Sequence, residues 1–205
     1  MKAIEHLKRI LSVPAGYRLF RRLVGGKDVL RIYLDEYVKP VPGEKVLDIG
    51  CGPADVLDYL PKVDYTGVDI SPEYIASAQK RLGHRARFFC SDVAAFILQK
   101  EQGTFDLVLA TGVVHHLENS QATGLFELAR KALRPGGRLV TFDGCYVPGQ
   151  SRMARWVLAQ DRGKFVREQS QYESLASGFF SKIESTLRHD LLRIPYTHLI
   201  MRCSA

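Results

Sequence analysis

The sequence predicts an α/β fold with a doubly wound, mostly parallel seven-stranded sheet. Three observations support this prediction. From Lys45 onward, short apolar runs alternate with helical stretches, as in parallel sheets that are buried on both faces. A small glycine-rich loop, Gly50 to Gly52, directly follows the first apolar run. After Gly144 the alternation stops, and the chain ends in two β-like runs that lie too close together for a parallel crossover.

Five strands are predicted in the parallel part of the sheet, and the first four are each followed by a helix. This alternation predicts right-handed crossovers between parallel strands. The segments are VLDIG with the helix ADVLDYL, YTGVDI with PEYIASAQKRL, ARFFCSDV with a short helix to Lys100, FDLVLATGVV with SQATGLFELARKAL, and the last strand GRLVTFDG.

Capping residues set the expected helix ends. Ser71 is a candidate N-cap for the second helix, Pro72 occupies its first position, and Gly83 follows its last turn. The long helix before GRLVTFDG ends in basic residues, followed by Pro135 and two glycines.

The flanking segments complete a single predicted domain that spans residues 1–205. A helical N-terminal cap is expected over residues 1–40, ahead of a core of residues 41–145. Residues 146–181 are predicted to form a helical insertion that acts as a lid. Residues 182–205 are predicted to form an antiparallel hairpin at one edge of the sheet.

The net charge of +7 belongs to the two flanks. Residues 1–40 carry nine Lys and Arg against four Asp and Glu, and residues 150–205 carry nine against five. The segment between them is slightly acidic. The excess positive charge favours solubility, and it would also suit an anionic acceptor, a nucleic acid or a membrane surface.

Compartment and redox state are predicted from what the sequence lacks. No uncharged window approaches the roughly 20 residues of a membrane-spanning helix, and the N-terminus has no apolar centre of a secretory signal. We therefore expect a cytoplasmic protein. No C-x-x-C pair or nearby histidine at ligand spacing accompanies the cysteines, so buried reduced thiols and no metal site are expected. The cysteines are Cys51, Cys90, Cys145 and Cys203.

The loop from Gly50 to Gly52 lies where a doubly wound sheet binds its ligand, at the carboxyl end of a strand. A phosphate-binding P-loop is excluded because no Gly-Lys-Ser/Thr follows. A dinucleotide is disfavoured because Asp55 stands at the third small position of G-x-G-x-x-G/A, where its carboxylate would repel a pyrophosphate. Asp48, ahead of the glycines, instead favours a ligand that is cationic at this loop.

Residues 41 to 145 resemble the class I S-adenosylmethionine-dependent methyltransferases of the small-molecule type, whose fold is Rossmann-like. VLDIGCGPADVL resembles the first motif of that family, with Asp48, Gly50 and Gly52 at its D-x-G-x-G and Ala54 in place of the next glycine. GVDIS, FFCSDV, FDLVLATGVVHHL and ALRPGGRLVTFD resemble the following segments in the family's order. The resemblance implies an enzyme that uses S-adenosylmethionine as its cofactor.

The resemblance also implies a set of cofactor contacts. Asp69 would take the ribose hydroxyls and Ile70 would pack on the adenine, while Asp92 would lie near the adenine amino group with Val93 beside the ring. Loop capping by Asp48 and helix N-capping by Asp69 and Asp92 are the alternatives. The expected cofactor-binding residues are Asp48, Gly50, Cys51, Gly52, Asp69, Ile70, Asp92, Val93 and Thr111.

His115 and His116, just after the fourth strand, are the candidate catalytic residues. Methyl transfer from a sulfonium depends mainly on alignment, and it needs a base only where the acceptor must lose a proton. An imidazole can take that proton at neutral pH. Because adjacent residues point in different directions, at most one of the two is expected to face the active site. Helix capping or acceptor positioning is the alternative role.

The expected acceptor is a small molecule. The N/D-P-P-Y/F signature of amino methylation on nucleobases or glutamine is absent, and so is the catalytic cysteine arrangement of cytosine C5 enzymes. Aromatic and arginine side chains in the flanks would fit an acceptor with an apolar or planar body and a negative group. They are Tyr17, Phe20, Arg21, Arg22, Tyr146, Arg152, Arg155, Trp156 and Arg162.

Three alternatives stay open at this point. An RNA methyltransferase would use the basic flanks for phosphate contacts, although no appended RNA-binding motif is found. A membrane-surface methyltransferase acting on a lipid or lipid-linked glycan would use the N-terminal helical face of Ile4, Leu7 and Leu11. A non-enzymatic binding protein is the third.

Overall fold

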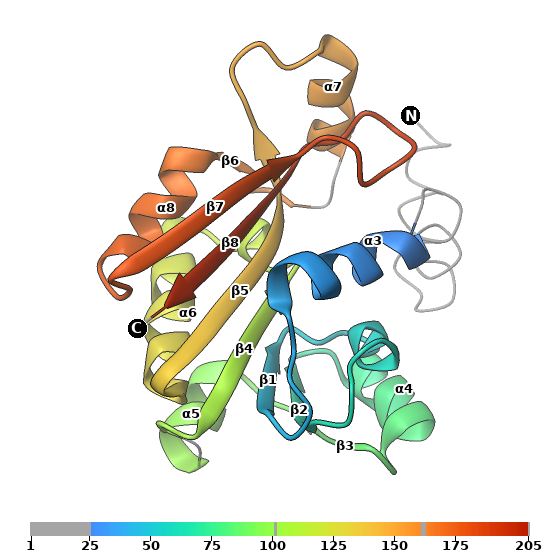
Figure 1. Ribbon diagram of the computed structural model, residues 1–205, viewed down its shortest axis with the longest axis vertical. Coiled ribbons are helices and arrows are strands. Elements are labelled where there is room, and N and C mark those ends of the chain that lie inside the picture. The colour runs from blue at the N-terminus through green and yellow to red at the C-terminus, as the bar shows by residue number, and fades with distance from the viewer. Residues whose placement is uncertain (1–25, 101, 161–162, 205) are drawn as a thin grey trace.

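Seven strands hydrogen-bond side by side in the order β3-β2-β1-β4-β5-β8-β7 (Figure 1). The computed structural model describes residues 26–100, 102–160 and 163–204. The first five strands pair in parallel, and β8 runs antiparallel to both β5 and β7, which confirms the predicted sheet with its edge hairpin. The strands are β1 (Lys45–Ile49), β2 (Asp64–Asp69), β3 (Ala86–Cys90), β4 (Phe105–Thr111), β5 (Leu133–Tyr146), β7 (Lys182–Arg188) and β8 (His198–Ser204).

Helices cover both faces of this sheet because the strand residues alternate between two buried apolar clusters. Figure 1 shows α5, α6 and α8 on one side of the sheet and α3 and α4 on the other. The helices are α3 (Gly26–Ile32), the π-helix η1 (Tyr33–Val38), α4 (Pro72–Leu82), α5 (Val93–Lys100), α6 (Asn119–Ala132), α7 (Arg152–Gln160) and α8 (Gln169–Ser177).

The helix α4 begins and ends as its capping residues predict. The Tyr74 main-chain N–H donates to the Ser71 hydroxyl at 3.3 Å, and Gly83 is the C-cap. The helix α6 ends with Arg130 and Lys131 in its last turn, again as predicted.

Two segments differ from the prediction. The glycine loop leads only into the short 3-10 helix η2 (Asp55–Asp58) rather than a full helix. Ala54 adopts a left-handed conformation just before it, and Pro61 follows closely, so the segment has little room to extend. After β5, the helices α7 and α8 are separated by the two-residue strand β6 (Arg167–Glu168), which pairs with the end of β5.

Strand order reverses between β1 and β4, since the chain runs outward from β1 to β3 and then returns to the other side of β1. Loops that follow strands on either side of such a reversal diverge and leave a crevice at the carboxyl ends. The glycine loop and the turn after β4 therefore border the position where a ligand is expected.

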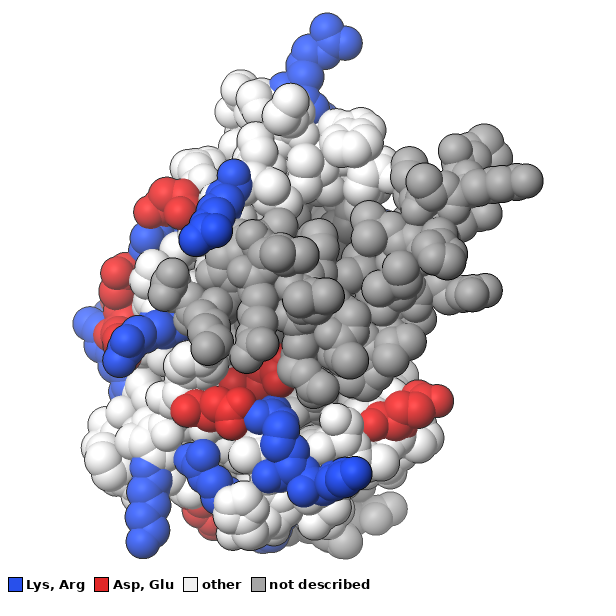
Figure 2. All heavy atoms as spheres, turned by 90° about the vertical axis from the view of Figure 1, so that its right-hand side faces the viewer, with Lys and Arg blue, Asp and Glu red and all other residues white. Residues whose placement is uncertain are grey.

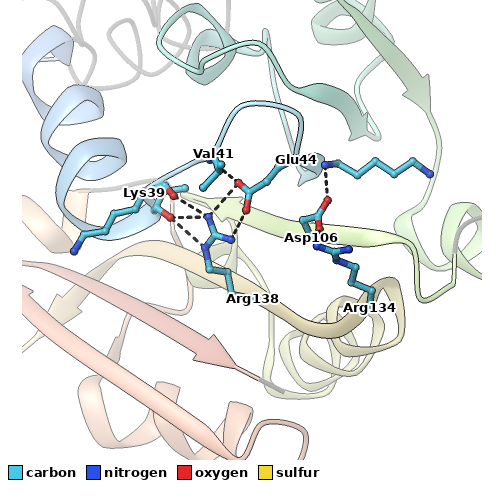
Figure 3. Close-up of polar contacts among 8 residues, drawn as sticks. Lys39, Val41, Glu44, Asp106, Arg134 and Arg138 are labelled. Carbon is cyan, nitrogen blue, oxygen red and sulfur yellow. Dashed lines mark hydrogen bonds and ion pairs between the residues drawn. The ribbon is translucent and has the colours of Figure 1, made fainter.

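At the opposite end of the sheet, where the parallel strands begin, Arg138 on β5 joins three segments (Figure 3). Its guanidinium pairs with the Glu44 carboxylate at 2.7 Å and donates to the Val38 and Lys39 carbonyl oxygens at 3.0 Å. Burial disfavours the charged Glu44 carboxylate, but hydrogen bonds from Arg138 and the Val41 N–H hold the pKa of Glu44 below its usual value. These contacts attach the end of η1 to the sheet.

Asp106 makes a second link at this end of the sheet (Figure 3). Its carboxylate accepts a hydrogen bond from the Lys45 main-chain N–H at 2.7 Å and forms an ion pair with Arg134. The starts of β1 and β4 are thereby joined to the start of β5.

The predicted N-terminal cap is described only from Gly26 onward. Within the described ranges, no helix combines the length and the apolar character needed to cross a bilayer. The predicted face of Ile4, Leu7 and Leu11 lies outside the described residues, as do the lid candidates Tyr17, Phe20, Arg21, Arg22 and Arg162.

Candidate functional site

The glycine loop packs closely against the ends of β2 and β4. Gly50 has a left-handed φ of 66°, and a Cβ added there would lie 2.7 Å from a Val113 methyl carbon. The Gly50 N–H donates to the Val68 carbonyl at 2.8 Å. A Cβ on Gly67 would lie 2.8 Å from the Cys51 sulfur. Glycine is therefore required at both positions, and Cys51 serves as a small buried side chain within the loop.

Asp69, at the end of β2, connects this loop to the next one. Its carboxylate accepts hydrogen bonds from the Gly52 N–H at 2.9 Å and the Ser71 N–H at 2.8 Å, one on each oxygen. An ionised carboxylate has about four acceptor positions. Asp69 can therefore hold the loop and still accept two ligand hydroxyl groups.

Ile70 follows Asp69 and leaves 76% of its surface exposed. A large apolar side chain at this position, next to a polar loop, offers a surface on which a flat ring can pack. The packing of Ile70 on the adenine, which the resemblance implies, stays a prediction.

Asp48 lies beneath the loop and is 2% exposed. One carboxylate oxygen accepts a hydrogen bond from the Tyr65 hydroxyl at 2.5 Å, and the other has no hydrogen-bond partner among the described residues. Burial raises the pKa of Asp48 to about 7, against the hydrogen bond from Tyr65, and the charge of Asp69 adds to the rise. A cationic ligand group beside this carboxylate would favour its ionised form.

Asp92 and Val93 lie at the start of α5. An Asp92 oxygen accepts a hydrogen bond from the Ala94 N–H at 2.8 Å, so the helix-capping alternative is realised in the structure. Val93 is half-buried beside it. Thr111 ends β4, with its hydroxyl beside the buried Tyr33 phenol.

The cysteines correct one expectation. Cys51, Cys145 and Cys203 are buried, but Cys90 is exposed because β3 is an edge strand of the sheet. Within the described ranges, no three His, Cys, Asp or Glu side chains are grouped so that they could hold a metal ion.

The two histidines lie in the short 3-10 helix η3 (Val114–His116) and have different surroundings. His115 is 6% exposed, and its Nδ1 lies 2.7 Å from an Asp143 carboxylate oxygen. His116 is exposed. Sequence reasoning missed Asp143, which lies on β5, 28 residues further along the chain. Its one available signal was an acidic residue inside an otherwise apolar strand pattern.

The segment after β5 covers this end of the sheet, and Figure 1 shows α7 projecting beyond the strands. The Arg155 guanidinium lies over the Tyr146 ring at 5.1 Å, and Leu158 packs against Gly144. Met153 and Trp156, one helical turn apart, are 64% and 60% exposed. The helix α7 thus places Arg155 near the carboxyl end of β5 and exposes two large apolar side chains. That this segment acts as a lid stays a prediction.

Comparison with known proteins identifies related sequences. A family model described as a methyltransferase domain matches residues 46–137. Phosphoethanolamine N-methyltransferase 3 of Arabidopsis thaliana is 32% identical over 131 residues, which cover 60% of this chain. The hybrid PKS-NRPS synthetase pydA of an Acremonium species is 28% identical over 217 residues, which cover 93% of this chain. The alignments span only 26% and 5% of these two relatives.

Solved structures share the fold. Phosphoethanolamine N-methyltransferase 2 of Haemonchus contortus, in complex with phosphomonomethylethanolamine and S-adenosylhomocysteine, gives a TM-score of 0.70 at 18% identity, over 88% of this chain and 53% of that one. Geranyl diphosphate C-methyltransferase of Streptomyces coelicolor gives 0.65 at 13% identity, over 87% and 80%. The family match and the five motifs, which occur in order along the strands, show a methyltransferase domain over residues 46–137. They support its assignment to the class I S-adenosylmethionine-dependent methyltransferases, whose fold these solved structures share.

Proposed function

We propose that the chain transfers the methyl group of S-adenosylmethionine to a small acceptor with an apolar or planar body and an anionic group. The lid is the observation that carries this proposal. Its helix α7 starts close to the end of β5 and carries Arg152, Arg155 and Trp156 on its exposed surface. Arg152 is exposed, and the exposed Arg155 guanidinium lies over the Tyr146 ring, so this helix offers positive charge to a carboxylate or phosphate.

The cofactor-binding part of the proposal rests on the strand ends. Asp48 would face the cationic part of the cofactor, Asp69 would accept the ribose hydroxyls, and Ile70 would pack on the adenine. Asp92 and Val93 complete the adenine side. The site fits the cofactor because it pairs a buried carboxylate that lacks one partner with an exposed apolar side chain. When bound, the cofactor supplies an electrophilic methyl group on a sulfonium.

Surface charge supports a small acceptor. Among the described residues of the visible face, Figure 2 shows acidic and basic side chains intermingled over its lower part. The upper part, at the height of α7, is mostly uncharged with Lys or Arg at its tip. A nucleic acid would favour an extended basic track. The names of the compared enzymes include phosphoethanolamine and geranyl diphosphate, which both carry phosphate.

An acceptor screen with methyl-labelled cofactor tests the proposal. Paired compounds, with and without a phosphate or carboxylate, are compared, beginning with phosphoethanolamine and ethanolamine. We expect transfer to the anionic members, and about a tenfold or larger increase of their KM in Arg155→Ala, with cofactor affinity unchanged. Lys182→Ala, which changes an exposed lysine on β7, is the control. Equal turnover of charged and uncharged members would contradict an anionic acceptor.

A membrane-surface acceptor is the second candidate, and the exposed Met153 and Trp156 favour it. A tryptophan beside arginines on one helix is typical of segments that lie in a membrane interface. Sedimentation with vesicles of mixed zwitterionic and anionic lipid tests this function. We expect Trp156→Ala to reduce vesicle binding. Val41→Ala, at the amino end of the sheet, should leave vesicle binding unchanged. Absence of vesicle binding by the unaltered chain removes this candidate.

A further inference from the structure

We propose that Asp143 is a positioning residue that prepares His115 to act as general base, and that the acceptor atom therefore carries a proton that leaves during methyl transfer. This inference rests on the proposed function and narrows its acceptor to a class. Hydroxyl and ammonium groups belong to that class. Thioethers and tertiary amines do not, because they have no proton to lose.

Asp143 holds His115 at two points. One carboxylate oxygen lies 2.7 Å from the His115 Nδ1 and also accepts a hydrogen bond from the His115 main-chain N–H at 3.1 Å. An ionised carboxylate can only accept hydrogen bonds. Nδ1 must therefore carry a hydrogen, and in the neutral ring the lone pair that can take a proton is on Nε2.

The other edge of the imidazole is directed toward the lid. A Cβ on Gly112, after β4, would lie 3.8 Å from the His115 Cε1, and a Cβ on Gly163, in the lid, would lie 2.0 Å from its Cδ2. Nε2 is the ring atom between these two carbons. It therefore lies on the side where the lid meets the end of β4, which is where the proposed acceptor binds.

The turn that carries His115 is also fixed from outside. The buried Arg167 of β6 donates to the Val114 carbonyl at 3.2 Å and to the Leu117 carbonyl at 2.6 Å, on either side of His115. The Phe165 N–H donates to the His115 carbonyl at 3.0 Å. A base held this firmly loses little entropy at the moment of reaction.

A purely structural role leaves the negative charge of Asp143 unexplained. The side-chain oxygen of an asparagine could accept both hydrogen bonds without burying a charge. Asp143 is 2% exposed, and its second oxygen has no hydrogen-bond partner among the described residues. Burying such a charge is unfavourable. A carboxylate is advantageous only when the imidazole becomes positively charged, as a general base does.

The proposed step balances in atoms and charge. The acceptor atom forms a bond to the methyl carbon as the carbon–sulfur bond breaks, and the electron pair of that bond stays on sulfur. The acceptor proton moves to Nε2 of His115, and Asp143 stabilises the resulting imidazolium. Among the described residues, the His116 ring lies 4.3 Å from the His115 ring, and the Arg167 guanidinium binds the Val114 carbonyl next to His115. Release of the proton to solvent restores the neutral base.

Nitrogen NMR of the imidazole rings tests the positioning without an acceptor. The full chain is saturated with S-adenosylhomocysteine, and the His115 signal is assigned from its loss in His115→Gln. We expect the neutral ring to carry its hydrogen on Nδ1. In Asp143→Asn the pH midpoint of this ring should fall by about one to three units, because an opposite charge has been removed. A neutral ring with its hydrogen on Nε2 overturns the proposal, and this measurement on the unaltered chain stands even if the variant does not fold.

Turnover tests the catalytic consequence, with whichever acceptor the screen identifies. We expect Asp143→Asn to reduce kcat by about 10²-fold with KM and cofactor affinity unchanged, and the acidic limb of its pH profile to move to lower pH. Glu127→Gln, on the exposed surface of α6, is the control. An unchanged kcat, or a preferred acceptor without a transferable proton, overturns this inference alone. Failure of the unaltered chain to bind the cofactor instead contradicts the proposed function.

Discussion

The two ends of the sheet hold charged side chains in different ways. At the amino end, Glu44 and Arg138 pair with each other, and Asp106 pairs with Arg134. At the carboxyl end, Asp48 and Asp143 are each 2% exposed, and each keeps one oxygen without a hydrogen-bond partner in the described part of the chain. A buried carboxylate that is only partly paired is destabilising. The difference indicates that charge at the amino end serves stability. It supports our proposal that Asp48 and Asp143 at the carboxyl end belong to the functional site.

The largest expected effect is a loss of stability from a substitution at the amino end. Arg138→Ala should lower the free energy of unfolding by about 3 kcal/mol, since it leaves the Glu44 carboxylate and the Val38 and Lys39 carbonyls without their donor. Denaturant unfolding measures this loss. The affinity of the folded fraction for S-adenosylmethionine should not change. A variant that keeps its stability but loses cofactor affinity would reverse the roles assigned to the two ends.

At the carboxyl end, Asp69→Ala should instead lower the affinity for the cofactor. The change removes the acceptor for the Gly52 and Ser71 N–H groups and for the proposed ribose hydroxyls. We expect the affinity for S-adenosylmethionine, measured by calorimetry, to fall by about 100-fold, from lost hydrogen bonds to a charged group. Asp64→Ala, at the exposed amino end of the same strand, is the matched control. Equal effects of the two variants would show that Asp69 has no special place in the site.

Sequence reasoning predicted local segments better than contacts between distant segments, for a physical reason. Gly50, Asp69 and Ile70 each belong to a short segment whose strand ending and turn chemistry can be recognised locally. The contact of His115 with Asp143 spans 28 residues, and that of Arg167 with Leu117 spans 50. Such contacts depend on which strands become neighbours, and no local pattern reports that.

The helix ends show the same distinction. Ser71 and Pro72 determined the start of α4 through local capping, so it was predicted correctly. The helix expected after the glycine loop was wrong, because Ala54 takes a left-handed conformation that an alanine does not suggest. The π-helix η1 was not anticipated either. Its end is held by Arg138, 100 residues away from Val38.

Asp48→Asn tests the difference between the two ends through the pH dependence of stability. Because burial raises the pKa of Asp48 to about 7, its contribution to stability is fully present below the pKa of the unfolded chain, near 4, and is lost as the pH rises through 7. Between pH 5 and 8 the cofactor-free chain should lose about 2 kcal/mol of stability relative to the asparagine variant. Unfolding curves at several pH values measure this difference. Parallel pH dependences of the two proteins would show that Asp48 does not titrate in this range.

The smallest effect is expected from truncating one of two exposed apolar side chains, which lie at opposite ends of the sheet. Ile70 is 76% exposed at the carboxyl end, and Val41 is 56% exposed at the amino end. Neither Ile70→Ala nor Val41→Ala should change the free energy of unfolding by more than about 0.5 kcal/mol, since both side chains already lie in water. If Ile70 packs on the adenine, its truncation removes apolar contact area only in the complex. That loss corresponds to a reduction in S-adenosylmethionine affinity of about tenfold. Calorimetric titration of both variants with S-adenosylmethionine tests this prediction. An equal affinity of the two variants would contradict a contact between Ile70 and the adenine.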